Sequence, residues 1–312
     1  MKAAVLTLDG FEIQDVERPT VGPDEVLIKT QACGICSGDL FVYQNRPDFY
    51  QTYNRLGHEA SGEIIEIGRN VTAFKLGDMV TALALPAYSQ YFAAPANRIV
   101  KLPSQVDPKI ALGEAVACCI HAAGRFGIKP GDNVAVIGLG FMGQICLQLA
   151  KYQGAGFICA IDPVAERREL SKHFGADATF NPLESTGQEI LDSLGEFDVV
   201  IEAAGVQSAI DLSTELVAIH GRIVLVGYHQ SNNGMRSVNI ERWNYKAIDV
   251  VNGHVRNEDE KTKVMELGMQ LIEKGHISTK ELIAFYDFDQ IDQAFQELDG
   301  RKTGLLKAVL LM

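Results

Sequence analysis

Three short segments of the chain carry residue types that bind metals. Cys33 and Cys36 form a C-x-x-C motif, and the segment Gly57–Glu59 places a histidine next to a glutamate. A third segment further along the chain contains Glu114. A catalytic zinc ion needs about three protein ligands of the S, N or O type and one open position for water or substrate. One thiolate, one imidazole and one carboxylate from these segments meet that need.

The C-x-x-C motif has two other interpretations, a redox pair and half of a zinc knuckle. No second C-x-x-C motif occurs in the chain, and this one does not follow the strand of a β-α-β unit, so the sequence favours neither. A histidine such as His58 is also commonly a structural residue. From spacing alone, a metal site and an ordinary structural role for these residues both stay open.

A glycine-rich turn fits the G-x-G-x-x-G fingerprint of dinucleotide-binding proteins. The predicted strand Asn133–Ile137 leads into the turn, and Asp162 ends the next predicted strand, nineteen residues beyond the last glycine. Such a turn lets the backbone approach a pyrophosphate at the N-terminus of the following helix. The turn consists of Gly138, Leu139, Gly140, Phe141, Met142 and Gly143.

Asp162 also predicts which dinucleotide binds. A carboxylate at this place accepts hydrogen bonds from the adenosine ribose and repels a 2′-phosphate, which favours NAD over NADP. Arg167 and its neighbour Arg168 weaken this preference, because a nearby guanidinium accommodates a 2′-phosphate. We therefore expect NAD as the cofactor. The other interpretation of the turn is a glycine-rich loop with a capping aspartate.

The elements that must position these residues fall into three parts. Short alternating strands separated by glycine and proline fill the first hundred residues, which indicates a compact barrel or sandwich. After Pro108, strands alternate with helices, which predicts β-α-β units and a parallel sheet. Amphipathic helices at 258–274 and 289–298 and a strand at 303–311 follow. The pattern predicts a β-rich domain, an inserted α/β domain and a return to the first domain.

Composition excludes several classes of protein. The 312 residues include 28 Lys+Arg against 40 Asp+Glu, a formal charge of −12, which argues against nucleic acid as a partner. No apolar run is long enough to span a membrane, and the N-terminus lacks the apolar core of a secretory signal. Six cysteines without such a signal suggest thiols or metal ligands rather than disulfides. We therefore expect a cytoplasmic protein that binds no membrane.

In this order, the three segments and the fingerprint resemble the zinc-dependent medium-chain dehydrogenase/reductase family, which includes alcohol, sorbitol and threonine dehydrogenases. The likeness extends over nearly the whole chain and includes the further motifs GPDEVLIK, GEIIEIG, VIEAAG and GRIVLVG. The resemblance implies an α/β protein with a β-rich GroES-like catalytic domain at 1–119 and 254–312. Between these parts it implies a Rossmann domain with a doubly wound parallel sheet, at 120–253.

The resemblance also implies roles for individual residues. It makes Cys36 and His58 zinc ligands, and Glu59 either a ligand or a carboxylate that exchanges with water. Glu114 falls where sorbitol-type enzymes have a glutamate and alcohol dehydrogenases have a cysteine. Asp39 is similar to the carboxylate that orients the ligand histidine. Which of the two glutamates is the resting third ligand stays open.

Beyond the fingerprint, the resemblance places the cofactor against Ala204, Gly227 and Tyr228. It implies one catalytic zinc per chain, because the structural-zinc lobe with its four closely spaced cysteines is missing. It further implies a homodimer or a homotetramer. A dehydrogenase of this kind would transfer a hydride between NAD and a secondary alcohol or the corresponding ketone. Glu114 in place of a cysteine makes the metal site harder and more polar, which favours a polyol, sugar or cyclitol.

Two alternatives to this function stay open. One is a zinc-free, NADPH-dependent enone or quinone reductase of the same superfamily, which would have no use for the zinc ligands. The other is a non-catalytic dinucleotide-binding protein. Gly38 favours the second, because many relatives have a hydroxyl residue there that relays the proton. Water, Tyr43, Tyr50 or His254 are the candidate replacements for that hydroxyl.

Overall fold

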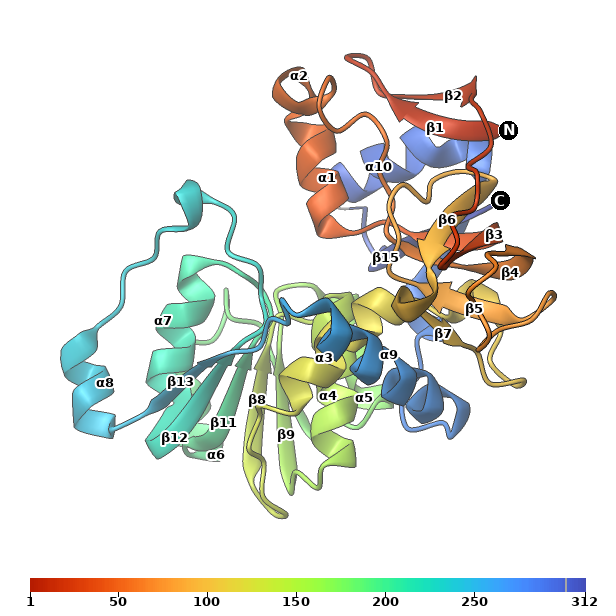
Figure 1. Cartoon of the computed structure of the whole chain (residues 1–312). Coiled ribbons are helices and arrows are strands. Elements are labelled where there is room, and N and C mark those ends of the chain that lie inside the picture. Colours follow the sequence, from red (N-terminus) through yellow and green to blue (C-terminus); the bar gives the residue numbers. More distant parts are fainter. Residues whose placement is uncertain (301) are drawn as a thin grey trace. The chain divides into compact units, whose positions relative to one another are not determined.

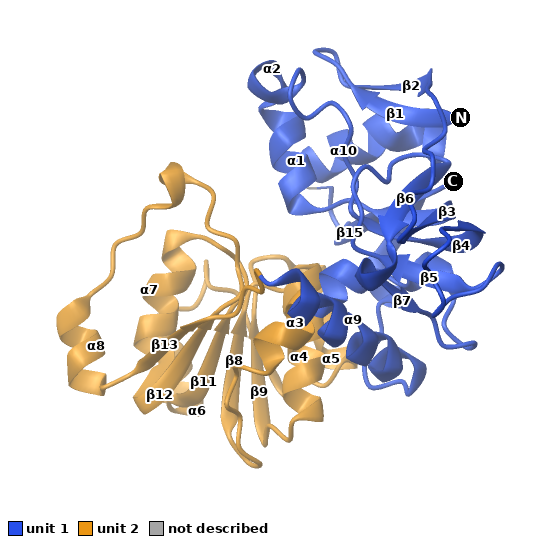
Figure 2. Ribbon diagram, in the orientation of Figure 1, with its two compact units in different colours: residues 1–117, 257–312 blue, residues 118–256 orange. Residues whose placement is uncertain are grey.

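The computed structural model describes residues 1–300 and 302–312, which divide into two compact units (Figure 1, Figure 2). Unit 1 consists of Met1–Ala117 and Asn257–Met312, and unit 2 is Cys118–Arg256. The domain boundaries predicted from the sequence lie after residues 119 and 253. The boundaries between the two units of the structure lie after residues 117 and 256. The three segments with metal-ligand residue types therefore lie in unit 1, and the glycine fingerprint lies in unit 2.

Unit 1 is built on a seven-stranded sheet and a separate hairpin. Its strands are β1 (Lys2–Leu6), β2 (Phe11–Asp15), β3 (Glu25–Gly34), β4 (Glu59–Ile67), β5 (Met79–Ala82), β6 (Tyr91–Pro95), β7 (Ile99–Lys101), β14 (Ile283–Asp287) and β15 (Lys307–Leu311). Strand β3 buries most of its side chains and pairs antiparallel with β4, β6 and β15. The C-terminal strand is thus hydrogen-bonded to the strand that leads to Cys36. A core that includes Tyr88, Phe92 and Phe295 packs in this unit.

The α-helices of the described part of unit 1 are short, except for one. They are α1 (Ser37–Gln44), α2 (Arg46–Phe49), α3 (Gly113–Ala123), which continues into unit 2, α9 (Glu258–Glu273) and α10 (Ile291–Asp299). Helix α9 begins at a capping asparagine, Asn257, whose side chain accepts from the N–H of Glu260. Three acidic residues in its first turn stabilise the positive end of the helix dipole. This long helix carries Lys261, which reaches the candidate site described below.

Unit 2 contains a six-stranded sheet in the order β10-β9-β8-β11-β12-β13, in which every neighbouring pair is parallel. Its strands are β8 (Asn133–Ile137), β9 (Phe157–Ile161), β10 (Ala178–Phe180), β11 (Phe197–Glu202), β12 (Val217–Leu225) and β13 (Asp249–Asn252). Its helices are α4 (Phe141–Tyr152), α5 (Ala165–His173), α6 (Gly187–Leu194), α7 (Gln207–Leu216) and α8 (Ile240–Lys246). The strand order reverses between β8 and β11, which is where doubly wound sheets bind ligands.

The predicted parallel sheet is confirmed, and the differences from the sequence are local. Helix α1 was predicted as part of a β-rich region, because it is short and has Gly38 in its first turn. The first helix after Pro108 begins at Gly113, because Pro108–Ile110 forms a 3-10 turn. The 3-10 segments of the described chain are η1 (Ala96–Arg98), η2 (Pro108–Ile110), η3 (Asn232–Gly234), η4 (Lys280–Leu282) and η5 (Phe288–Gln290).

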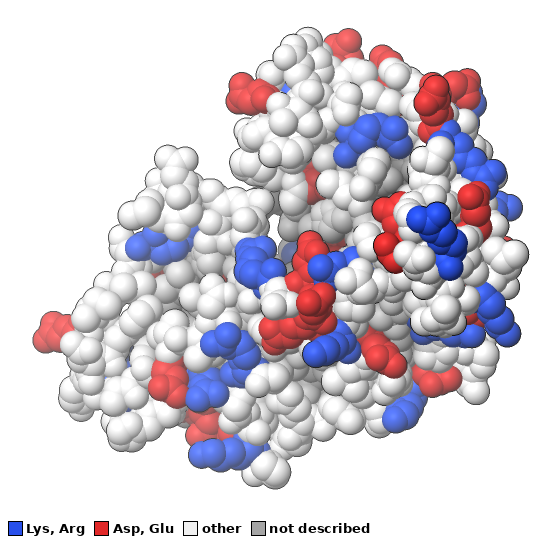
Figure 3. Space-filling model, in the orientation of Figure 1, with Lys and Arg blue, Asp and Glu red and all other residues white. Residues whose placement is uncertain are grey.

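Two general features bear on partners. Within the described residues, the structure has no helix with the length and apolar character that crossing a membrane requires. On the face shown in Figure 3, lysine and arginine side chains are interspersed with aspartate and glutamate. Phosphate backbones are bound by clustered positive charge, and the charges coloured on this face alternate in sign.

Candidate active site

Cys36 lies at the junction between a strand and a helix. Strand β3 ends at Gly34, and Cys36 is the N-cap residue of helix α1 with an extended backbone. Its sulfur accepts a hydrogen bond from the N–H of Gly38, with an S···N distance of 3.4 Å. A sulfur at this place takes the role that an oxygen usually has at an N-cap.

His58 and Glu59 bring the second and third donor atoms. His58 ends the loop before β4, and Glu59 is the first residue of that strand. The sulfur of Cys36, a ring nitrogen of His58 and a carboxylate oxygen of Glu59 all lie within 4.8 Å of one another. Among the residues that the structure describes, this is the one group of this kind. We call these three residues the donor group.

Asp39 and Tyr88 hold the imidazole of His58 from behind. Oδ1 of Asp39 lies 3.4 Å from Nδ1 of His58, and the hydroxyl of Tyr88 donates to Oδ2 of Asp39 at 2.7 Å. Burial, reinforced by the charge of Asp39, raises the pKa of Tyr88 well above its usual value, so the hydroxyl keeps its proton and donates. Tyr88 is 1 % exposed. A carboxylate at Nδ1 fixes the ring and leaves Nε2 for a metal.

The donor group has a strongly negative environment. Burial alone would lower the pKa of His58, but the hydrogen bonds and charges of Asp39 and Cys36 outweigh it and raise the pKa to about 12. The metal-free site therefore stabilises a positive charge at the imidazole. A divalent cation at the same place would satisfy the same anions and displace this proton.

Glu59 forms a buried ion pair across the sheet. Nζ of Lys307, on β15, lies 2.6 Å from both carboxylate oxygens and donates to Oε1. Burial opposes the charged form of Lys307, but the charge of Glu59 outweighs it, and the pKa of the lysine is raised. Gly34 leaves room for this pair, because a Cβ there would lie 2.3 Å from Oε2 of Glu59. Any side chain at position 34 would push the carboxylate away.

Glu114 forms an ion pair with Lys261. Its Oε1 lies 2.7 Å from Nζ of Lys261, and its oxygens are outside the donor group. Burial opposes its charge, but the positive charges of Lys261 and His58 outweigh this, and the pKa of Glu114 is lowered. Glu114 is therefore a carboxylate close enough to His58 to interact electrostatically. Glu59, inside the donor group, and Glu114, outside it, are thus each paired with a lysine.

The residues present fit a zinc ion. In tetrahedral zinc sites the S, N and O donors lie 2.0–2.3 Å from the metal, which puts them about 3.5 Å from one another. The donor group needs only a small contraction to reach that spacing. Oε2 of Glu59 is buried and already faces a positive charge, the ammonium group of Lys307, at a place that a metal cation would share or take over. A soft thiolate, an imidazole and a carboxylate together suit zinc.

Cys33, the other cysteine of the motif, is outside this group. It is buried, and its S–H points to the carbonyl of Gly34. Burial, together with the charge of Glu59, raises the pKa of Cys33 well above its usual value, so it stays a thiol. No disulfide joins any of the six cysteines.

Sequence reasoning missed three residues of the site, Tyr88, Lys261 and Lys307. Each comes from a distant part of the chain, so no local motif marks it. The structure corrects one candidate for the proton-relaying hydroxyl, Tyr43. The Tyr43 hydroxyl donates to Asp292, and its ring stacks on Phe11, inside the core of unit 1. Tyr43 therefore cannot replace the missing hydroxyl at Gly38.

In unit 2 the glycine fingerprint forms a tight strand-to-helix turn. Gly138 has a φ of +92°, and a Cβ on Gly143 would lie 1.8 Å from the carbonyl oxygen of Gly138. A Cβ on Gly140 would meet no protein atom within 4 Å, so the space in front of it is open. Helix α4 begins at the next residue, Phe141, and directs the positive end of its dipole to this space. The turn can cradle a pyrophosphate.

Asp162 closes one side of this turn. Its carboxylate is buried and accepts from the N–H groups of Leu139 and Val164, each at 2.8 Å. The guanidinium of Arg167 lies 3.7 Å away. The other predicted cofactor residues lie beyond strands on the far side of the strand-order reversal: Ala204 follows β11, and Gly227 and Tyr228 follow β12. Met142 lies in the first turn of α4.

Comparison with known proteins agrees with both halves of this description. Residues 22–104 match the family model for the alcohol dehydrogenase GroES-like domain, and residues 142–270 match that for zinc-binding dehydrogenases. An L-threonine 3-dehydrogenase of Caldanaerobacter subterraneus is 32% identical over 254 residues, covering 70% of this chain and 73% of the relative. A sorbitol dehydrogenase of Bacillus subtilis is 29% identical over 348 residues, covering 99% and 97%.

A solved structure shows the same fold. It is a zinc-binding dehydrogenase from Sinorhizobium meliloti bound to NADP, with a TM-score of 0.88 and 24% identity. The match covers 100% of this chain and 99% of that one. The family follows from the L-threonine 3-dehydrogenase, which is 32% identical over more than two thirds of both chains, together with the two family models. The chain therefore belongs to the zinc-dependent medium-chain dehydrogenase/reductase family.

Proposed function

We propose that the protein is a zinc-dependent dehydrogenase that transfers a hydride between NAD and a secondary hydroxyl group of a polyol, sugar or cyclitol. The observation that carries this proposal is the donor group of Cys36, His58 and Glu59, with Asp39 behind the imidazole. A zinc-free reductase would have no use for these side chains. The relatives named as sorbitol and threonine dehydrogenases support an alcohol as the substrate.

Cys36, His58 and one of the two glutamates would hold one zinc ion per chain. When bound, zinc supplies Lewis-acid polarisation of the substrate oxygen. Asp39 keeps the ring of His58 in the orientation and tautomer that presents Nε2, and Tyr88 keeps Asp39 in place. Glu59 is already within the donor group, which supports it as the third ligand at rest.

Glu114 would join the site through the oxygen that does not bond Lys261, or by leaving Lys261. Its lowered pKa keeps it a carboxylate, so it can exchange with Glu59 or accept a hydrogen bond from a substrate hydroxyl group. Substrates with several hydroxyl groups offer such a donor next to the reacting carbon. The polar surroundings of the donor group therefore support a polyol-like substrate.

NAD fits unit 2 through the open space before Gly140 and the carboxylate of Asp162. The cofactor supplies the hydride chemistry, and the protein supplies position and electrostatics. Both Asp162 oxygens already accept backbone N–H groups, so each has one lone pair left for ribose hydroxyl groups. This arrangement supports NAD, whereas Arg167 at 3.7 Å would lower the penalty for a 2′-phosphate.

The test is metal content combined with a cofactor-coupled screen. Elemental mass spectrometry of protein purified without chelators should find about one zinc per chain. Cys36→Ala should lose the zinc and NAD-linked oxidation of every polyol tried. Cys33→Ala is the matched control, because it removes a neighbouring buried thiol outside the donor group and should keep the metal. A wild-type protein without zinc would instead indicate the metal-free reductase or the non-catalytic binder.

We also infer an oligomer and a cytoplasmic location. Strand β13 is an edge strand of the parallel sheet, bonded to β12 on one side. An edge strand of this kind can pair with its copy in a second subunit. Analytical ultracentrifugation should therefore give the mass of a dimer or a tetramer. The mass of a monomer at micromolar protein concentration would contradict the inferred oligomer. Six cysteines without a disulfide suit a reducing compartment, which cell fractionation can check.

A further inference from the structure

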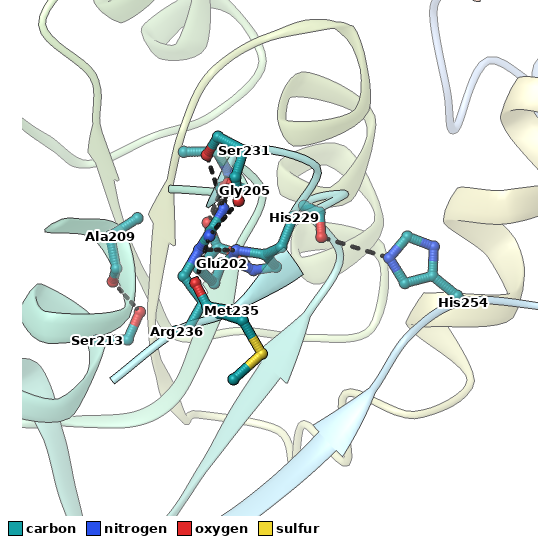
Figure 4. A network of polar contacts seen from close by, with 11 residues as sticks. Glu202, Gly205, Ala209, Ser213, His229, Ser231, Met235, Arg236 and His254 are labelled. Carbon is teal, nitrogen blue, oxygen red and sulfur yellow. Dashed lines mark hydrogen bonds and ion pairs between the residues drawn. The ribbon is translucent and has the colours of Figure 1, made fainter. Parts of the chain in front are cut away.

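Arg236 is the centre of a polar network in unit 2 (Figure 4). Its Nε donates to Nδ1 of His229 at 3.0 Å. Nη1 donates to the carbonyls of Ser231 and Met235, both at 2.7 Å, and Nη2 donates to the carbonyl of Gly205 and to Oγ of Ser231, both at 3.0 Å. A guanidinium has five N–H groups, and here there are five acceptors. This geometry fixes the side chain fully.

The network defines the tautomer of His229. Because Arg236 donates to Nδ1, that nitrogen carries the lone pair. The proton of the neutral ring must then be on Nε2, which lies 3.1 Å from Oε2 of Glu202 and donates to it. His229 is therefore a neutral link between the guanidinium of Arg236 and the carboxylate of Glu202. We call these three side chains the relay.

Glu202 connects the relay to two backbone turns. This residue ends β11 and is fully buried. Its Oε1 accepts from the N–H groups of Ala204 at 2.9 Å and Gly205 at 2.6 Å. Its own carbonyl accepts from the N–H groups of Val226 and Gly227. One residue thus ties the turn after β11 to the turn after β12.

The two turns lie against each other. A Cβ on Gly227 would be 2.3 Å from the nitrogen of Gly205 and 2.7 Å from Oε2 of Glu202. Any change in the Glu202 side chain would therefore move both turns. Arg236 adds a second link, because it bonds the carbonyl of Gly205 from the segment beyond β12. Glu202 and Arg236 thus hold the turn at Gly205 from two different segments of the chain.

The position of these turns in the sheet gives the relay a function. The fingerprint and Asp162 follow β8 and β9, on one side of the strand-order reversal, and would hold the adenosine half of a dinucleotide. The turns after β11 and β12 lie on the other side, at the carboxyl ends of their strands. A dinucleotide across this crevice places its nicotinamide half there.

We propose that Arg236, His229 and Glu202 are positioning residues that hold the backbone at Ala204–Gly205 and Gly227–Tyr228 in the conformation that binds the nicotinamide half of the cofactor. The proposal rests on the dinucleotide-dependent function proposed above. The relay acts through the backbone, so none of its side chains needs to touch the cofactor. It adds residues to the binding machinery that the glycine fingerprint does not reveal.

The segment beyond β12 depends on this network for its order. Met235 is 68% exposed, and Ser231 to Asn233 are exposed as well, so little apolar packing fixes the loop. Next to Arg236, the other bonds to helix α7 come from Gln207, whose side chain binds both the N–H and the carbonyl of Ser237. Further along the segment, Trp243 and Lys246 also bond this helix. Loss of the guanidinium would therefore release the loop and, with it, the turn at Gly227.

The experiment compares two ligands that share the adenosine half. Wild type and Arg236→Gln are titrated with NADH and with ADP-ribose, which lacks the nicotinamide. NADPH and 2′-phospho-ADP-ribose replace them if wild type prefers NADPH. The dissociation constant for the whole dinucleotide should rise about tenfold or more in the variant, while that for the fragment should change less than about twofold. Arg242→Gln is the matched control, because Arg242 is exposed on α8 and the change should affect neither ligand.

Three outcomes are informative. Equal weakening of both ligands, or no change in either, would overturn the relay proposal and leave a dehydrogenase without it. Failure of wild type to bind any dinucleotide would overturn the proposed function as well. If Arg236→Gln does not fold, His229→Phe replaces it, because it keeps a ring and removes only the link between Arg236 and Glu202. The same selective loss of the whole dinucleotide is expected, and an unchanged ratio would overturn the proposal.

Discussion

The donor group of unit 1 and the glycine turn of unit 2 are built in opposite ways. The donor group uses side chains, and its supporting partners are far away in the sequence: Glu59 and Lys307 are 248 positions apart, and Glu114 and Lys261 are 147 apart. The glycine turn uses backbone groups within six consecutive residues, closed by one aspartate. The first site is held together by charge in a buried place, and the second by close packing of the main chain.

This difference predicts different costs for mutations in the two sites. Removing one partner of a buried ion pair leaves an uncompensated charge, which is far more costly than losing a surface pair. Adding a methyl group to a close-packed turn forces a displacement, which costs less and acts locally. The changes below separate these effects and run from the largest to the smallest.

Lys307→Met should destabilise the metal-free protein by about 3–5 kcal/mol, because Glu59 stays buried without its counter-ion. Urea unfolding followed by circular dichroism measures this loss. Lys2→Met is the control, because its pair with Asp15 is exposed and should contribute little to stability. Adding Glu59→Gln to Lys307→Met should restore most of the stability. A loss as small as that of the control would show that the buried pair is not a charged one.

Gly143→Ala and Gly140→Ala should separate stability from binding in unit 2. At position 143 the new methyl group would lie 1.8 Å from the oxygen of Gly138, which should cost about 1–3 kcal/mol. At position 140 it would meet only open space, so stability should stay close to wild type. Binding of the dinucleotide should nevertheless weaken, because the methyl group fills the place of the pyrophosphate. Thermal unfolding and NADH titration measure the two effects, and a stable Gly143→Ala protein would contradict the close packing.

Asp162→Asn should narrow the preference for NAD over NADP by about tenfold, since the charge that repels a 2′-phosphate is removed. The amide keeps one acceptor for Leu139 or Val164, so the turn should persist. Titrations with NADH and NADPH give the ratio. An unchanged ratio would mean that Arg167, rather than Asp162, governs the choice.

Glu297→Gln should have the smallest effect on stability, and this effect should be seen only in the pH dependence at acidic pH. Lys302, Tyr286 and Gln293 donate hydrogen bonds to this partly exposed carboxylate and lower its pKa to about 2. Because the folded pKa is below the unfolded one, the carboxylate stabilises the fold above about pH 4.5. That stabilisation is lost as the pH falls toward 2. The free energy of unfolding, measured between pH 5 and pH 2, should therefore depend slightly less on pH in the variant than in wild type. An equal pH dependence in the two proteins would contradict this expectation.

The two regions also differ in how far the sequence predicts them. Strand β8 has the predicted bounds, because buried parallel strands read as short apolar runs between turn residues. The glycine spacing is local, so it can be read from one stretch. Helix α1 was missed because its cap is a cysteine and its first turn contains a glycine. The family was predicted from motifs and is confirmed by the relatives.

The supporting residues of the donor group could not be predicted. Lys307 reaches Glu59 because β15 pairs with β3, and Tyr88 reaches Asp39 from 49 positions away. Sequence patterns show the type of each element but not which distant side chains meet between them. The relay of Arg236 has the same origin, because its acceptors are mostly carbonyls, which every residue has. The roles assigned to Cys36, His58, Glu59 and Glu114 stay predictions until the metal is measured.

The lysine partners of Glu59 and Glu114 have a consequence for how the protein acquires its metal. Each carboxylate already has a positive charge beside it, so the empty site is balanced electrically. The chain can therefore complete its fold before any ion arrives, and zinc enters by exchanging places with protons and ammonium groups. Loading then becomes a reversible, late step that follows the supply of zinc in the cell, and a chelator should yield a folded protein that regains its metal.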